Sequence, residues 1–155
     1  MDTESLLKLL KENKVDFVVI GATAFPVHGY ARATLDIDIF IKSARENAER
    51  AWKALKKFGY DMTDITIEDL LTKKLLIRQY AVETDIHPHV KGISFDEVWR
   101  NKVREKFGKT FIYFASLDDL IKMKKAAGRI KDLEDLKMLR EIKKMKKRKK
   151  KEING

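Results

Sequence analysis

The chain has 155 residues, of which 44% are hydrophobic and 37% are charged, and it contains no cysteine. This is enough apolar material for one globular core, so the composition excludes a disordered chain, a collagen-like chain and a small disulfide-stapled protein. The net charge is +10, but residues 143–155 carry +7 of it, which leaves only +3 for the first 142 residues. Most of the basic character therefore belongs to the C-terminal segment.

The apolar segments are too short to cross a membrane. The longest, residues 17–27, is interrupted by Gly21, Thr23 and Pro26, whereas a spanning helix needs about 18 consecutive apolar residues. The first ten residues are acidic and then amphipathic, unlike the basic start of a signal peptide. With no cysteine, one glutamine and four asparagines beside abundant lysine, the sequence favours a cytoplasmic protein from a thermophilic source.

Apolar periodicity and turn residues predict a mixture of helices and strands. In chain order we expect a helix over 5–14, a strand over 17–20, a short helix over 22–28, a strand over 36–41, a helix over 44–58, strands over 75–80 and 81–87, a helix over 95–105, a strand over 110–114, a helix opened by Ser116, and a last helix from about Asp132. Strands and helices do not alternate regularly, so the predicted class is α+β (mixed α/β), with helices packed on a small mixed sheet. We expect one domain over residues 1–142, followed by a frayed or disordered basic tail over 143–155.

Two aspartates interrupt the apolar strand DIDIFI. Because strand side chains alternate, Asp36 and Asp38 lie on one face, and the isoleucines point to the other. Two adjacent carboxylates repel each other and are costly to desolvate, and a divalent cation with a preference for oxygen ligands removes both problems. The pair alone is also consistent with a solvent-facing edge strand, so it does not by itself establish a metal site.

A third carboxylate follows in the segment VETDIH. Asp85 shares a strand face with Glu83 and His87. If this strand lies beside the first, Asp85 completes a set of three carboxylates of the kind that two-metal phosphoryl transfer requires. The alternative is a surface aspartate at a strand end.

Gly21-Ala22-Thr23 directly follows a buried strand and begins a short helix. Glycine permits close backbone approach, and a helix N-terminus presents free N–H groups to phosphate. Such turns are common, so the turn alone does not establish a phosphate site. The carboxylate pair in the next element strengthens that interpretation.

Taken together, the stretch IGATAFPVHGYARATLDIDIFI (residues 20–41) resembles the signature of the nucleotidyltransferase fold of the DNA polymerase β superfamily. It is most similar to the minimal and abortive-infection (AbiEii-like) nucleotidyltransferases of prokaryotes. Those proteins carry a Gly-Gly or Gly-Ser turn, a short helix, Arg-x-Thr or Arg-x-Ser, and then Asp-x-Asp. The resemblance covers most of residues 15–142, since Asp85 matches the third carboxylate, and residues 120–136 match the closing pattern of a lysine-bearing helix, an arginine, Lys-Asp and Asp-Leu.

The resemblance implies a Mg²⁺-dependent enzyme (Mn²⁺ is an alternative ion) that transfers a nucleoside monophosphate from an NTP such as ATP. Its implied catalytic and metal-binding residues are Asp36, Asp38 and Asp85. The implied nucleotide-binding residues are Gly21, Ala22, Thr23, Arg32, Thr34 and Lys124. Ala22 departs from the family pattern, because a serine at this place could donate a hydroxyl hydrogen bond to phosphate and alanine cannot.

The acceptor is left open among a protein hydroxyl, an RNA and a small molecule. The resemblance also implies a toxin–antitoxin partner. A function of a different class, a non-catalytic binding or antitoxin module that contacts a partner protein or RNA, is the alternative. The eight basic residues of Lys143–Lys151 form either a solvated terminus or a non-specific nucleic-acid contact, since no aromatic residue stands among them.

Six other residues have structural interpretations in preference to functional ones. We expect Trp52 and Trp99 to be packing anchors. His87-Pro88-His89 lacks a third metal ligand nearby, although His87 shares the face of Asp85. Asp132 and Asp135 are expected to cap a helix or to pair with Arg129.

Overall fold

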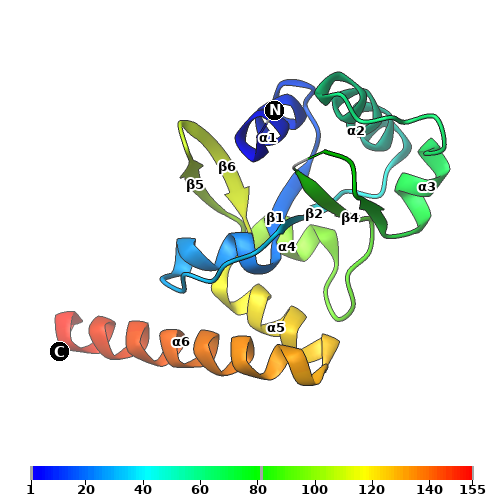
Figure 1. Cartoon of the computed structure of the whole chain (residues 1–155). Helices are drawn as coiled ribbons and strands as arrows, with labels where there is room; N and C mark the ends of the chain where they lie inside the picture. Colours follow the sequence, from blue (N-terminus) through cyan, green and yellow to red (C-terminus); the bar gives the residue numbers. More distant parts are fainter. Residues whose placement is uncertain (1, 81, 155) are drawn as a thin grey trace.

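The structure is a computed structural model that describes residues 2–80 and 82–154. It contains a six-stranded sheet with helices on both faces (Figure 1). The strands are β1 (Phe17–Ile20), β2 (Asp36–Ile41), β3 (Leu75–Ile77), β4 (Glu83–His87), β5 (Val103–Phe107) and β6 (Thr110–Phe114). The helices are α1 (Thr3–Glu12), α2 (Arg45–Phe58), α3 (Ile67–Thr72), α4 (Phe95–Asn101), α5 (Leu117–Ala127) and α6 (Leu133–Asn154), with 3-10 helices η1 (Gly21–His28) and η2 (Ile130–Asp132). The predicted α+β class is confirmed.

The sheet order is β3-β4-β2-β1-β6-β5, which places β2 between β1 and β4. β2 pairs with β1 in the antiparallel sense, with Ile20 opposite Asp38, and with β4 in the parallel sense, with Asp38 opposite Asp85. All four residues of β1 are buried, as expected for a continuous apolar run at the centre of a sheet. Asp38 therefore lies between the last residue of β1 and the middle residue of β4.

The two faces of the sheet pack against different helices. Figure 1 shows α1, α2 and α3 on one side and α4, α5 and α6 on the other. Phe40, which follows Asp36 and Asp38 on their strand face, contacts Phe95 of α4 with a ring-centroid distance of 5.3 Å. The carboxylates therefore lie on the face covered by α4 and α5, while the isoleucines of β2 are buried in the core beneath α1 and α2.

The expected helix over 95–105 is wrong in its second half. α4 ends at Asn101, and residues 103–107 form β5, which pairs with β6 across the two-residue turn Gly108-Lys109. Gly108 has φ +63°, a conformation that favours glycine and closes the hairpin. The segment VREKF is compatible with either structure locally, so its non-local pairing with β6 decides the outcome.

Two further differences concern short elements. Helix α3 was not expected, although Thr66 and Asp69 form a reciprocal capping box at its start. The strand expected over 75–80 ends at Ile77. The strand expected over 81–87 is observed from Glu83, and its first residue, Ala81, lies outside the described residues.

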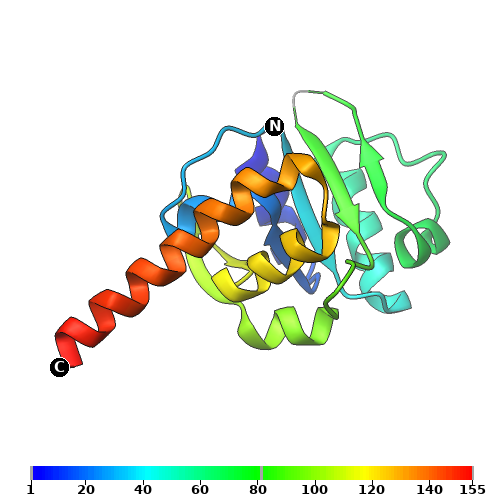
Figure 2. The same ribbon diagram turned by 90° about the horizontal axis from the view of Figure 1, so that it is seen from below.

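Residues 143–154, which the sequence suggests are frayed or disordered, continue α6 in the structure. Lysine, arginine, methionine and glutamate are good helix formers, and no glycine or proline interrupts them before Gly155. From Lys144 onward every described residue is exposed, and both views show this end of α6 extending beyond the rest of the molecule (Figures 1 and 2). Across the described ranges, no helix combines the length and the apolar character that a membrane span needs.

Candidate active site

Three carboxylates meet where β2 and β4 run side by side. Ligand oxygens of Asp36, Asp38 and Asp85 all lie within 4.8 Å of one another. Asp36 and Asp38 are half-buried and Asp85 is buried. The predicted juxtaposition of the three residues is thus present, and it follows from the strand period together with the parallel β2–β4 register.

Asp85 has the most perturbed environment of the three. Burial raises the pKa of its carboxyl group, the negative charges of Asp38 and Asp36 raise it further, and a hydrogen bond from Arg78 opposes the shift. A carboxylate with a raised pKa accepts a proton more readily than an exposed one. Without a bound cation, burial therefore disfavours the charged form of Asp85.

Arg78 extends into the same cluster from the end of β3. Its Nη1 lies 2.6 Å from Oδ1 of Asp85, its Nη2 lies 3.6 Å from Oδ2 of Asp36, and its Nε lies 3.8 Å from Oε2 of Glu83. These contacts raise the pKa of the guanidinium, with the hydrogen bond to Asp85 as the largest cause. The cluster thus holds one positive side chain at contact distance.

Asp38 is held from two sides. Its Oδ1 lies 2.8 Å from Nε2 of His87. On the other side it approaches Gly21, which has φ +69°, and a Cβ placed there would lie 2.5 Å from Oδ2 of Asp38. Any side chain at position 21 would collide with the carboxylate, so glycine is required for both its conformation and its lack of a side chain.

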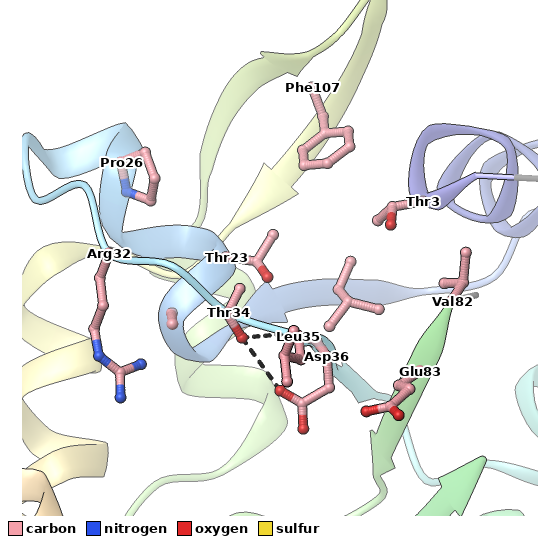
Figure 3. A pocket seen from close by; sticks show the side chains of 12 residues that line it. Thr3, Thr23, Pro26, Arg32, Thr34, Leu35, Asp36, Val82, Glu83 and Phe107 are labelled. Carbon is pink, nitrogen blue, oxygen red and sulfur yellow. Dashed lines mark hydrogen bonds between the residues drawn. The ribbon is translucent and has the colours of Figure 1, made fainter. Parts of the chain in front are cut away.

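A cleft of about 280 Å³ opens on the Asp36 side of the cluster. Ala22, Thr23, Arg32 and Thr34 line it, together with Asp36 (Figure 3). Thr34 Oγ1 donates to Asp36, at 2.9 Å from the backbone oxygen and 3.2 Å from Oδ1, as the dashed lines show. Thr34 therefore orients the first aspartate.

A second cleft of about 360 Å³ opens on the Asp38 side. Its charged lining is strongly positive. Four cations line it against the single carboxylate of Asp38, and they are Lys74, Lys91, Lys124 and Arg129. This volume is within the range of small-molecule sites. Lys124 and Arg129 are paired with buried aspartates behind the lining, so among the described residues Lys74 and Lys91 are the lining cations available to a polyphosphate.

Two predicted phosphate contacts are already paired within the protein. Arg32 Nε lies 3.1 Å from Oδ1 of Asp135, and Lys124 Nζ lies 3.1 Å from Asp132 and 3.3 Å from Asp135. Asp132 and Asp135 are both buried. Arg129 donates to Asp132 as well, and this contact is the main reason why the pKa of Asp132 falls to about 2. Asp132 thus pairs with Arg129 as expected, whereas Asp135 pairs with Arg32 and Lys124 instead.

The six predicted nucleotide-binding residues are consequently divided. Ala22, Thr23, Arg32 and Thr34 line the cleft beside Asp36, whereas Gly21 and Lys124 line the cleft beside Asp38. The sequence interpretation missed Lys74, Lys91 and Arg78. Arg78 had a usable signal, because it stands in an apolar segment expected to lie beside the Asp85 strand.

The other singled-out side chains have structural contacts. His89 Nε2 lies 3.2 Å from the backbone oxygen of Leu71. Trp52 Nε1 donates to the backbone oxygen of Ile65 at 2.7 Å, and Trp99 stacks on Phe95. The expectation that both tryptophans are packing anchors agrees with these positions.

The donor set fits a divalent cation such as Mg²⁺. It consists of hard carboxylate oxygens within 4.8 Å of one another, which is the chemistry that Mg²⁺ and Mn²⁺ prefer. Burial is the main cause of the raised pKa of Asp85, and the negative charges of Asp38 and Asp36 add to it, so the carboxylates repel one another. A bound cation would relieve that repulsion.

Comparison with known proteins agrees with this geometry. Residues 2–148 match the family described as "Nucleotidyltransferase of unknown function (DUF6036)". Among solved structures, the chain is similar to a candidate nucleotidyltransferase from Thermotoga maritima, with a TM-score of 0.59 and 19% identity over 87% of this chain and 88% of that one. At this identity the likeness concerns the fold. No curated protein matches the chain.

Proposed function

Because this chain belongs to the DUF6036 nucleotidyltransferase family, we propose that it transfers a nucleoside monophosphate from an NTP to an acceptor hydroxyl and releases pyrophosphate. One observation carries the proposal, the meeting of Asp36, Asp38 and Asp85 on adjacent strands. These three residues would hold the Mg²⁺ or Mn²⁺ ions. Bound there, the ions would neutralise phosphate charge and acidify the acceptor hydroxyl.

In the proposed reaction the acceptor oxygen forms a bond to the α-phosphorus, and the bond from that phosphorus to the bridging α–β oxygen breaks. Pyrophosphate leaves with the bond electrons. The hydroxyl proton passes to the carboxylate of Asp85, which lies opposite Asp38 on the neighbouring strand β4. Thr34 and His87 keep the two β2 aspartates in position through the hydrogen bonds described above.

We assign the cationic cleft beside Asp38 to the triphosphate. Its positive lining complements a polyphosphate, and Gly21 and Lys124 belong to it. Ala22, Thr23, Arg32 and Thr34 extend the nucleotide site on the Asp36 side. Ala22 contributes only its backbone N–H there, so phosphate binding depends more on the cations than it would with serine.

The acceptor is proposed to be a macromolecule, a protein hydroxyl or an RNA. The resemblance of residues 20–41 to abortive-infection nucleotidyltransferases is the basis for proposing a toxin–antitoxin pairing, and the basic end of α6 supports contact with nucleic acid. Incubation with each α-labelled NTP and a whole-cell lysate identifies both the nucleotide and the acceptor class. Label that enters protein or RNA only with active enzyme supports transfer, with ATP as the first nucleotide to test.

The decisive comparison is between Asp38→Asn and Asp118→Asn. Both changes remove one carboxylate, but Asp118 is an exposed residue of α5 that pairs with Lys143. We expect Asp38→Asn to abolish labelling and to weaken Mn²⁺ binding in isothermal titration, while Asp118→Asn retains both. Equal labelling and equal Mn²⁺ binding in the two variants would contradict the proposal.

A second candidate is a nucleotidyltransferase-like module without turnover that binds a partner protein or RNA. Ala22 in the turn and the guanidinium of Arg78 among the carboxylates favour it. On this hypothesis, partner or RNA binding survives Asp38→Asn, and a Mn²⁺ soak leaves no octahedral density at the three aspartates. Metal density there, together with labelling activity, would favour the enzyme.

A further inference from the structure

Four carboxylates gather at this end of the sheet, those of Asp36, Asp38, Glu83 and Asp85. Arg78 contacts three of them, and its contact with Asp85 at 2.6 Å is a short charge-assisted hydrogen bond. Asp38 turns instead toward His87. One guanidinium therefore offsets much of the repulsion among carboxylates that would otherwise stand close together without a cation.

A divalent cation at the aspartates needs the same carboxylates. Both Asp85 and Asp36 belong to the candidate metal ligands and to the contacts of Arg78. Two cations a few ångströms apart repel each other, and the repulsion is stronger in a partly buried site than in water. The guanidinium and the metal are therefore competitors for one cluster.

The side chain of Arg78 is able to leave while its backbone stays in place. The next residue is held to the loop after α2, because Asp61 N donates to Gln79 Oε1 at 2.6 Å and Gln79 Nε2 donates to Asp61 O at 3.1 Å. The Arg78 side chain itself is 41% exposed. Rotation of this long side chain toward solvent thus requires no movement of the strands.

We propose that Arg78 is a displaceable counter-cation of the carboxylate site. It holds Asp36, Glu83 and Asp85 together when no metal is bound, and it competes with the divalent cation for them. Arg78 accordingly sets the metal concentration at which the site fills. This inference rests on the proposed function, because it takes the three aspartates as metal ligands.

Titration calorimetry with Mn²⁺ alone tests the proposal on the full chain, without nucleotide or acceptor. We expect Arg78→Gln to bind Mn²⁺ about tenfold more tightly than the wild type, equivalent to about 1.4 kcal/mol. Arg45→Gln is the matched control, since it removes the same charge from an exposed pair with Glu68 on another surface. The control should bind Mn²⁺ as the wild type does.

Thermal unfolding supplies a second measurement. Without metal, Arg78→Gln should melt at a lower temperature than Arg45→Gln, because its carboxylates lose their counter-cation, and saturating Mn²⁺ should raise its melting temperature more than that of the control. Should Arg78→Gln fail to fold, Arg78→Lys replaces it. Lysine keeps the charge but cannot reproduce the fork of N–H donors that a guanidinium presents, so we expect an affinity for Mn²⁺ above that of the wild type.

Two failures are distinguishable. If the wild type binds Mn²⁺ and Asp38→Asn does not, while Arg78→Gln or Arg78→Lys binds no more tightly than the wild type, Arg78 is not a competitor and only this inference is overturned. If none of the proteins binds Mn²⁺, the metal site of the proposed function fails and the inference fails with it. If Arg78→Gln binds Mn²⁺ more tightly than the wild type and Arg45→Gln does not, the result supports both the metal site and the competition by Arg78.

Discussion

Replacement of Gly21 by alanine tests the close approach of the first turn to Asp38. The new Cβ would lie 2.5 Å from Oδ2 of Asp38, whereas ordinary contacts begin at 3.4 Å, so the carboxylate must move by about 0.9 Å. That movement strains the 2.8 Å contact between Asp38 and His87. Displacement of a reacting group by about 1 Å typically lowers a rate by about a hundredfold.

The same substitution also has a backbone cost, which a control separates from the effect on the site. Gly21 has φ +69°, where an L-residue is less stable than glycine by about 1–2 kcal/mol. Gly29 has φ +99°, but a Cβ there would meet nothing within 4 Å. Gly29→Ala should therefore lose similar stability and keep the arrangement of Asp38.

Urea unfolding and Mn²⁺ titration of the two variants make the comparison. We expect Gly21→Ala and Gly29→Ala to lose comparable free energies of unfolding. Only Gly21→Ala should bind Mn²⁺ more weakly, by about tenfold, which is equivalent to about 1.4 kcal/mol. Transfer of label should fall by about a hundredfold in the same variant alone. If the two variants have the same Mn²⁺ affinity and the same labelling activity, the claim that a side chain at position 21 displaces Asp38 is refuted.

Three further predictions concern stability and the basic end of α6. The pKa of Asp132 falls from 3.8 to about 2 on folding. Above pH 4 its charged form therefore contributes about 2 kcal/mol to the free energy of unfolding, and this contribution is lost as the pH falls through 2. The free energy of unfolding of Asp132→Asn should therefore fall less between pH 5 and pH 2 than that of the wild type. An equal fall in the two proteins would contradict this prediction. Trp52→Phe leaves the backbone oxygen of Ile65 without its donor and should cost about 1 kcal/mol in urea unfolding, whereas a neutral result would show that water replaces it. Deletion of residues 143–155 should reduce the slope of log affinity for RNA against log salt by about 0.7 for each RNA phosphate that the segment neutralises, with Mn²⁺ binding retained, and an unchanged slope would mark a merely solvated terminus.

The sequence was sufficient to place Asp36 and Asp38 together on one strand face, because that pattern is local. The alternation in Asp36–Ile41 and the buried run in Phe17–Ile20 each follow from strand period and composition. Gly21 could be singled out for the same reason, since only its position between a strand and a short helix was needed. The placement of Asp85 required one assumption, the neighbourhood of two strands, and the resemblance to a known family supplied it.

Features that depend on pairing partners far along the chain were not predictable in this way. β5 is charged at three consecutive positions, and its strand conformation depends on the turn at Gly108 and on β6. The contacts of Arg32 with Asp135 join residues more than a hundred positions apart. The position of Arg78 likewise depends on β3 pairing with β4. In each case the deciding interaction is non-local, and propensity carries little information about it.

The two edge strands of the sheet, β3 and β5, affect how the protein behaves at high concentration. An open edge presents unpaired backbone groups and can recruit a second chain into an extended sheet, the first step of fibrous aggregation. β5 carries Arg104, Glu105 and Lys106 exposed in succession, so a second copy of β5 paired in register would bring like charges together. β3 has only three residues, too few for a stable partner ladder. Charge at one edge and brevity at the other thus protect a centrally apolar sheet from edge-to-edge growth.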